Sequence, residues 1–196
     1  IFTEGDIKHT AVIPIAGKNV TNDIRIGLRT SLEAAEEIKM SEGSLINSSE
    51  DEQKIIAVPS VSDKPDLEIS KSSLTHIITC RMDEILSKLM REIESSGYSS
   101  SIRAGIVITG GGSKLQGLDH YTESKYNIPV RIGSPKPIPG ITNLSGLTRF
   151  STAVGLLIYR DEQLKKMPHR ILPKNSFFTY LTKTWNKISS YFHREL

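Results

Sequence analysis

The segment GIVITGGGSKLQGL (residues 105–118) decides the fold class of this chain of 196 residues. It begins within the apolar run AGIVIT, which is typical of a strand buried in a sheet. Three consecutive glycines, Gly110, Gly111 and Gly112, follow directly, and then a predicted helix ends near Tyr126. Glycines at such a junction permit positive φ and expose backbone N–H groups, and the start of the helix favours an anion. The segment therefore predicts a strand, a glycine loop and a helix.

The glycine loop differs from the common phosphate-binding motifs. Lys114 follows Gly112 and Ser113, but the spacing G-x-x-x-x-G-K-[ST] is absent, and so is G-x-G-x-x-G. These differences argue against a P-loop NTPase and against a Rossmann enzyme. On the residues alone, a tight strand–helix turn and a loop that binds a nucleotide both remain open.

Strands and helices alternate on both sides of this segment. Predicted strands lie around Gly5-Asp6 and at residues 54–61, 66–70, 104–109 and 128–133. Predicted helices begin with Thr21 as N-cap, with a capping box of Thr30 and Glu33, and at residues 71 and 148. The polar residues 41–53 predict an exposed loop, and residues 134–144 a loop rich in proline and glycine. This alternation predicts an α/β fold with a mainly buried sheet.

Composition limits the class of protein further. The only cysteine, Cys80, rules out an internal disulfide, and the five histidines are scattered without metal-ligand spacing. No apolar window is long enough for a membrane-spanning helix. The chain begins at Ile1 with strand-like residues and no signal core, so we expect a fragment or processed part of a longer protein, without a secretory signal.

Charge is distributed unevenly along the chain. The net charge is +3, but residues 160–196 carry eight Lys/Arg and only three Asp/Glu. The basic character therefore belongs to the C-terminal tail, and a tail of this sign favours phosphate groups. Because the body carries no basic patch in its sequence, we do not expect a nucleic-acid binder.

The tail SFFTYLTKTWNKISSYFHREL (residues 176–196) has the pattern of an amphipathic helix. Its large apolar side chains fall within one arc of about 100° on a helical wheel. They are Phe177, Phe178, Leu181, Trp185, Ile188 and Phe192. Lys183 and Lys187 lie outside this arc, where they can reach anionic headgroups. The pattern favours a helix that lies in a membrane interface, and the alternative is a helix that packs on its own domain.

At this point the sequence resembles a known family. The strings GIVITGGGSKLQGL, IPVRIG and TAVGLL, together with TNDI (residues 21–24) and AEEIK (residues 35–39), are similar to those of actin-like ATPases, above all the FtsA family of bacterial cell division. The segment IPIAGKNVTNDI resembles a hairpin and helix that usually carry a Gly-Gly pair in the family, whereas here Ala16 precedes Gly17. The resemblance covers about residues 1–160.

The resemblance implies an actin-like (ribonuclease-H-like) ATPase fold, of which this chain is the C-terminal half. Residues 1–29 and 101–160 are then two parts of the core subdomain and residues 30–100 a smaller inserted subdomain. Residues 161–175 are then a linker before the amphipathic helix at residues 176–196.

The resemblance also implies a nucleotide site for ATP, with Mg²⁺ in the intact protein. It places Gly110, Gly111, Gly112 and Ser113 at the nucleotide, and Glu36 and Lys39 on a helix that faces it. A carboxylate and an ammonium three residues apart could contact ribose hydroxyls and an adenine edge, although a solvated ion pair has the same spacing. In the resembled fold, the phosphate-holding hairpins and the metal-organising carboxylates precede the segment that this chain resembles. We therefore expect no hydrolysis, and weak or no nucleotide binding, by this chain alone.

The partners that the resemblance implies are the C-terminal peptide of FtsZ, further copies of the chain in a filament, and an anionic membrane surface. Arg81 resembles the family's peptide-contacting arginine, with an ordinary surface arginine as the alternative. The implied place is the cytoplasmic side of the bacterial inner membrane, at the division septum. A cell-shape filament protein like MreB and a superfamily ATPase of the chaperone or sugar-kinase type remain alternatives.

Overall fold

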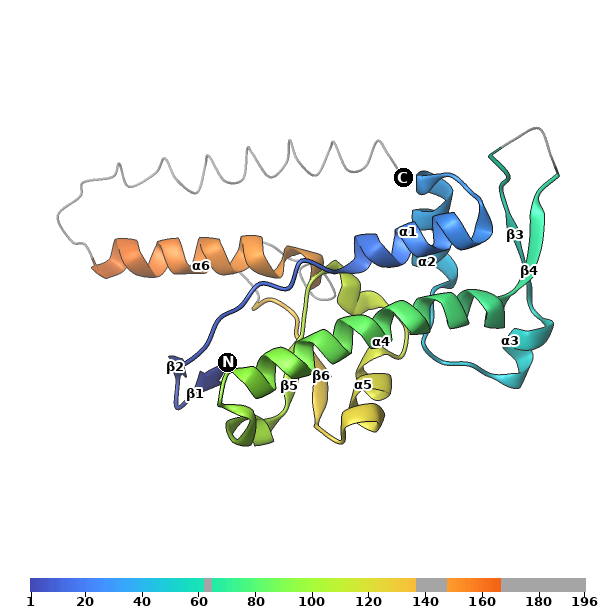
Figure 1. The fold of residues 1–196 in the computed structure, drawn as a ribbon. Coiled ribbons are helices and arrows are strands. Elements are labelled where there is room, and N and C mark those ends of the chain that lie inside the picture. Colours follow the sequence, from blue (N-terminus) through green and yellow to red (C-terminus); the bar gives the residue numbers. More distant parts are fainter. Residues whose placement is uncertain (62–64, 137–147, 167–196) are drawn as a thin grey trace, which may run out of the picture. The chain divides into compact units, whose positions relative to one another are not determined.

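The computed structural model describes residues 1–61, 65–136 and 148–166 (Figure 1). The predicted membrane helix, most of the predicted linker and most of the Pro/Gly-rich loop lie outside the described residues. The chain divides after Val154 into two units, and the first, Ile1–Val154, holds the core and the candidate site. Of the second unit, the structure describes only residues 155–166.

The predicted N-terminal hairpin is present but short. Strands β1 (Phe2–Thr3) and β2 (Asp6–Ile7) pair antiparallel. The two residues between them, Glu4 and Gly5, have φ of 57° and 85°. Positive φ at both central positions is the mark of a type I′ turn, whose twist matches that of paired strands.

Two helices follow, and both begin at other residues than predicted. Helix α1 (Gly17–Leu28) begins four residues before Thr21, with Ala16 as N-cap, and the Asn19 side chain accepts a hydrogen bond from the Ala16 N–H. The prediction of Thr21 as N-cap is therefore wrong. It fails because Thr21 is buried against the next helix and its hydroxyl has partners there.

Helix α2 (Leu32–Glu42) is capped by Ser31, whose hydroxyl accepts from the Ala34 N–H. The predicted cap, Thr30, is buried and donates its hydroxyl to the Pro59 carbonyl at 2.6 Å. The Thr30 side chain, which the local pattern predicts as the helix cap, thus forms a tertiary hydrogen bond and does not cap the helix. Ala35 and Ile38 on the inner face of this helix are buried, whereas Leu32 is exposed.

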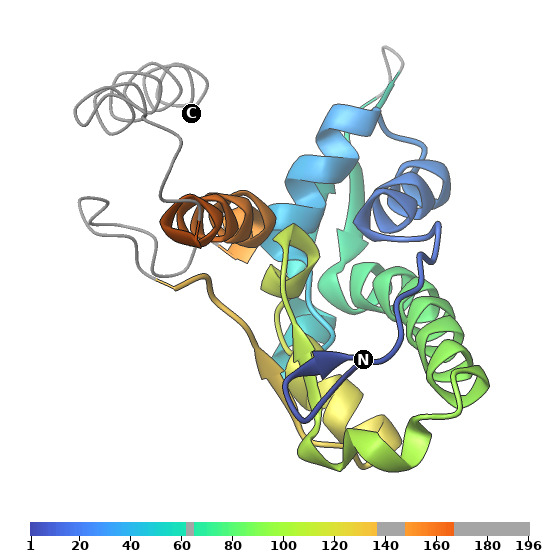
Figure 2. The ribbon, with the colours of Figure 1, turned by 90° about the vertical axis from the view of Figure 1, so that its left-hand side faces the viewer.

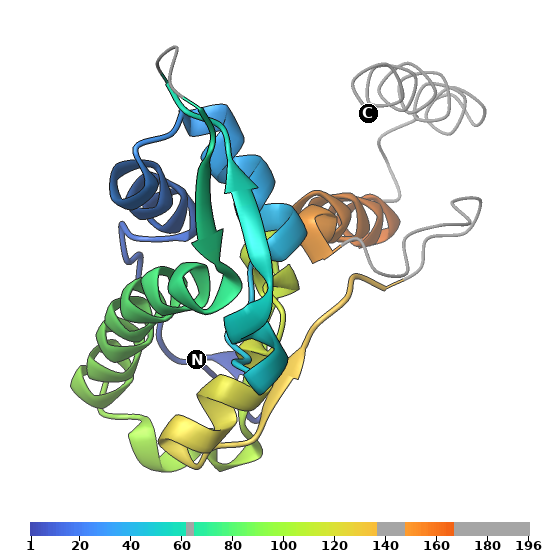
Figure 3. The same ribbon diagram turned by 90° about the vertical axis from the view of Figure 1, so that its right-hand side faces the viewer.

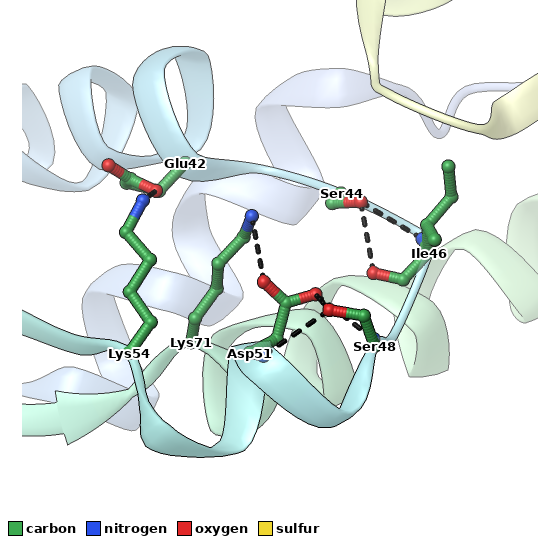
Figure 4. A network of polar contacts seen from close by, with 7 residues as sticks. All are labelled: Glu42, Ser44, Ile46, Ser48, Asp51, Lys54 and Lys71. Carbon is green, nitrogen blue, oxygen red and sulfur yellow. Dashed lines mark hydrogen bonds and ion pairs between the residues drawn. The ribbon is translucent and has the colours of Figure 1, made fainter.

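Residues 41–53 are not the simple exposed loop that their composition predicts. Ser44 and Leu45 are buried, and α3 (Ser49–Gln53) follows with Ser48 as its cap. Figure 4 shows the ion pairs that hold this segment, Lys71–Asp51 at 3.1 Å and Lys54–Glu42 at 2.6 Å. The pKa of Asp51 is lowered mainly by a hydrogen bond from the Ser48 backbone. A hydrogen bond from the Lys71 side chain is the second cause.

The core lies where the next elements meet α1 and α2. Strands β3 (Ile55–Val58) and β4 (Leu67–Ser70) pair antiparallel, and α4 (Lys71–Ser95) follows, as the periodicity predicts. Helix α1 lies next to both α2 and α4, and Figure 3 shows the β3–β4 hairpin beside α2 (Figures 1–3). The side chains fully buried between them include Val20, Ile24, Val58, Leu74 and Ile78.

The last part of the first unit carries the glycine loop. After η1 (Ser99–Ala104, a 3₁₀ turn), strands β5 (Ile106–Ile108) and β6 (Val130–Ile132) pair in parallel. Between them lie the 3₁₀ turn η2 (Gly111–Lys114) and helix α5 (Leu118–Tyr126), which make the crossover that a parallel pair requires.

The parallel pair is more open than predicted. Val107 at the middle of β5 is 51% exposed, although the pattern predicts a buried strand. The described strands form three separate two-stranded sheets, so no described strand flanks this pair. Strand β5 is therefore not the fully buried strand that its apolar run predicts.

The chain then reaches η3 (Thr148–Phe150) and α6 (Ser151–Lys166). The predicted helix over residues 148–164 is thus present, with a 3₁₀ start and two further residues at its end. The first six residues of the predicted linker are helical, because its first proline is Pro168 and nothing before it breaks the helix.

Candidate nucleotide site

The glycine loop has a backbone conformation that favours glycine at Gly110, and it has open space beside Gly112. Gly110 has φ 93° and ψ −178°, a conformation that is essentially restricted to glycine. Its N–H donates to the Thr148 carbonyl at 3.2 Å. Gly112 has no positive φ, and a Cβ there would meet no atom of the described residues within 4 Å. The surface beside Gly112 is therefore open to a ligand.

Hydroxyl groups hold this loop against the end of β5 and the start of α6. The Ser113 hydroxyl donates to the Gly110 carbonyl at 2.8 Å. The Thr109 hydroxyl donates to the Gly133 carbonyl, and its oxygen lies 2.7 Å from the Ser151 hydroxyl oxygen. Ser151 in turn donates to the Thr148 carbonyl, which also receives the Gly110 N–H. The loop is thus fixed by its own chain.

The predicted helix start at the loop needs a correction. The residues that follow Gly110 form a single 3₁₀ turn, and α5 begins only at Leu118. The predicted contribution of a helix dipole at the glycines is therefore wrong, because one short 3₁₀ turn aligns few peptide dipoles. What remains is the open backbone at Gly112.

The second predicted part of the site lies between α1 and α2. Lys39 Nζ lies 2.6 Å from Glu36 Oε2 and donates to Thr21 Oγ1 at 2.8 Å. It also lies 3.5 Å from the Gly17 carbonyl oxygen. The Thr21 hydroxyl has two acceptors within reach, Glu36 Oε2 and the Gly17 carbonyl. The pair is therefore more than an isolated surface ion pair, since both side chains also bind α1.

Electrostatics keeps this cluster charged. Partial burial opposes ionisation of Glu36, but hydrogen bonds from Lys39 and Thr21 and the charge of Lys39 outweigh it and lower the pKa of that carboxyl. The Glu36 side chain is 44% exposed, whereas that of Lys39 is 17% exposed. A carboxylate that is both ionised and half-exposed can accept hydrogen bonds from a ligand's hydroxyl groups.

The helix that carries Glu36 and Lys39 is tied to the chain just after the glycine loop. The Leu45 N–H donates to the Gln116 carbonyl at 2.9 Å, and Ser44 forms a β-bridge with Gln116. A Cβ on Gly43 would lie 3.1 Å from Leu115 Cδ1, which shows how close the two segments run. Both parts of the predicted site therefore belong to one packed unit, Ile1–Val154.

Arg81, the predicted peptide contact, is engaged inside the chain. It binds Asp23 of α1 through two nitrogens, with Nη2 2.7 Å from Oδ1, and it also binds Glu84. Its side chain is 25% exposed. The hydrogen bond to Asp23 is the main cause that raises the pKa of Arg81, against a smaller effect of burial. Arg81 thus ties α4 to α1, and its contact with a partner stays a prediction.

Sequence reasoning missed the hydroxyl groups around both parts of the site, those of Thr21, Thr109 and Ser151. No spacing rule reveals them, because the partners through which they join separate segments lie 15 or more residues away along the chain. A hollow of about 440 Å³ beside α1 is lined by Lys18, Asn19, Asn22 and Arg25 of α1 and by Leu32 of α2, none of which is a predicted nucleotide residue.

Among the helices of the described residues, none is long and apolar enough to cross a bilayer. Over the same residues, no three His, Cys, Asp or Glu side chains are grouped so that they could hold a metal ion.

Solved structures with a similar fold are actin-like. MreB5 of Spiroplasma citri bound to AMPPNP matches with a TM-score of 0.65 and 21% identity, over 85% of this chain and 50% of that one. The same protein bound to ADP matches with a TM-score of 0.63 and 19% identity, over 81% and 48%. The likeness confirms the predicted actin-like fold.

Sequence comparison is more specific. Residues 1–155 match the family described as cell division protein FtsA. The FtsA of Pseudomonas aeruginosa is 45% identical over 159 residues, which is 81% of this chain and 38% of the relative. That of Escherichia coli is 34% identical over 169 residues, 83% and 40%. That of Borreliella burgdorferi is 34% identical over 191 residues, 94% and 46%.

The chain spans about two fifths of the length of the curated relatives it matches. The matched residues 1–155 include the N-terminal hairpin, α1, α2, α4 and the glycine loop. They therefore include every residue of the candidate site. The resemblance that the motifs indicate is thereby confirmed. The chain belongs to the FtsA family of bacterial cell division proteins.

Proposed function

We propose that this chain acts in bacterial cell division as the C-terminal half of an FtsA-type adaptor. In this role an actin-like, ATP-binding protein polymerises at the inner face of the cytoplasmic membrane and tethers FtsZ there, at the septum. The observation that carries the proposal is the family match over residues 1–155. It favours the adaptor over the cell-shape filament protein and over the superfamily enzymes, because the matched family is that of cell division protein FtsA.

The nucleotide is held, in this proposal, by the open glycine backbone and by Glu36. The carboxylate is ionised and half-exposed, so it can accept hydrogen bonds from sugar hydroxyls. The glycine loop offers the exposed backbone of Gly112, and Ser113, which is buried, follows it. Two solved actin-like neighbours hold ADP and AMPPNP, which supports a nucleotide in this fold. The subdomain boundaries at residues 30, 100 and 160 are part of the same proposal.

Replacing Glu36 by glutamine should weaken ATP binding about tenfold in a full-length FtsA that carries these residues, because a charged acceptor is lost. Calorimetric titration with Mg-ATP measures this. The matched control is Glu37→Gln, at the exposed neighbouring position of the same helix, which should bind as the wild type does. Unchanged ATP binding by Glu36→Gln would contradict the assignment of Glu36 to the nucleotide site. Submillimolar ATP binding by this chain alone would contradict the expectation that the chain alone binds nucleotide weakly or not at all.

The membrane anchor is the second part of the proposal, and it rests on the sequence of residues 176–196. On anionic vesicles we expect this chain to float in a density gradient. A version that ends at Asn175 and the variant Trp185→Glu should remain at the bottom, because each removes apolar area that enters the interface. Vesicles of neutral lipid are the control for charge. If none of the three proteins floats on anionic vesicles, the tail is not an anchor.

A further inference from the structure

The hydroxyl of Thr21 lies at the centre of the cluster between α1 and α2. Thr21 is 2% exposed, in the middle of α1. Its oxygen accepts from Lys39 Nζ at 2.8 Å, and its proton can go to Glu36 Oε2 or to the Gly17 carbonyl. A hydroxyl has one proton and two lone pairs, so it can serve as acceptor for one partner and donor for another at the same time.

The two carboxylate oxygens of Glu36 differ in the hydrogen bonds that they accept. Both Thr21 and Lys39 reach Oε2, whereas Oε1 accepts no hydrogen bond from the described residues. Lys39 directs its ammonium at Glu36, at Thr21 and, at 3.5 Å, at the Gly17 carbonyl. Its three protons therefore face protein atoms, which suits a residue that holds Glu36 better than one that contacts a base.

We propose that Thr21 is a positioning residue, whose hydroxyl holds Glu36 and Lys39 in one arrangement and leaves Glu36 Oε1 for a sugar hydroxyl of the bound nucleotide. This inference rests on the proposed nucleotide function. Without Thr21, the Glu36–Lys39 contact would be an ordinary pair three residues apart on one helix, and such exposed pairs hold their side chains weakly. With it, the carboxylate is anchored to a second helix through a buried group.

The first test needs no nucleotide. In this chain, the pKa of Glu36 is measured by NMR titration of its side-chain carboxyl in the wild type, Thr21→Val and Thr21→Ser. Valine keeps the shape of threonine but removes one of the two donors that, with the charge of Lys39, lower the pKa of Glu36, so we expect this pKa to rise towards its ordinary value. Serine keeps the hydroxyl and should keep the low pKa. An unchanged pKa in Thr21→Val overturns the inference, and Thr21→Ala repeats the test should valine prevent folding.

The second test separates positioning from general packing. In a full-length FtsA that carries these residues, affinities for ATP and for 2′,3′-dideoxy-ATP are measured with each variant. Thr21→Val should weaken ATP binding about tenfold and hardly change binding of the dideoxy analogue, and Thr21→Ser should restore ATP binding. Equal weakening of both nucleotides overturns the inference. If Glu36→Gln does not affect ATP binding, the proposed contact of Glu36 with the nucleotide fails instead, and the pKa result is not affected by that failure.

Discussion

Replacing Gly105 by alanine should destabilise the first unit by about 3–4 kcal/mol. Gly105 has φ 103° and ψ −172°, a conformation that residues with a Cβ rarely adopt. A Cβ there would lie 2.3 Å from the Pro129 carbonyl oxygen. That oxygen accepts the Ile106 N–H at 2.8 Å, next to the register pair Ile106–Val130. Alanine would thus add backbone strain and push apart the residues that begin the β5–β6 pair.

Urea denaturation of this chain measures the effect, and two other glycines separate its causes. Gly97 has φ 76° but open surroundings, so Gly97→Ala carries the backbone strain alone and should cost about 1 kcal/mol. Gly112 has neither a positive φ nor a neighbour within 4 Å, so Gly112→Ala should stay within about 0.5 kcal/mol of the wild type. A Gly105→Ala variant that is as stable as Gly97→Ala would show that β6 moves aside at little cost.

Elements with a long, regular pattern were predictable from the sequence. The apolar spacing places α4 at residues 71–96, and the structure has Lys71–Ser95. Strands β3 and β4 and strands β5 and β6 were also predicted, because short runs of branched residues bounded by turn residues indicate strands. In each of these cases the local preference and the tertiary contacts favour the same structure.

The failures occur where a polar side chain has two possible partners. Thr21 and Thr30 have the chemistry of helix caps, but each is buried and binds a group that is distant in sequence. Ser44 looked like part of an exposed loop, yet it is buried beside Gln116. Local sequence does not show which partner is available, because that depends on how the helices pack.

The candidate site was predictable only in part. The family resemblance gave Glu36, Lys39 and the glycines, since those residues stand within recognisable strings. It gave no role to Thr21, whose importance comes from two bonds that reach α2. Nor could it show that Arg81 is bound to Asp23, because 58 residues separate the two side chains.

Arg81→Glu is expected to have two large effects. The first is on stability. It replaces a partly buried two-point ion pair with a carboxylate that faces both Asp23 and Glu84, which should cost about 2–3 kcal/mol. The second is loss of binding to the acidic C-terminal peptide of FtsZ, which fluorescence anisotropy measures in a full-length FtsA that carries these residues.

The double variant Asp23→Arg with Arg81→Glu separates these two effects, because it restores the ion pair with its charges exchanged. Most of the lost stability should return, while the cation moves from α4 to α1.

Arg81 has five N–H donors, and the bonds to Asp23 and Glu84 use three of its nitrogens once each. Two donors on a side chain that is 25% exposed therefore remain for a peptide carboxylate. We expect the double variant to be stable and still unable to bind the peptide. If it binds the peptide as the wild type does, Arg81 acts only by joining α4 to α1, and another residue contacts FtsZ.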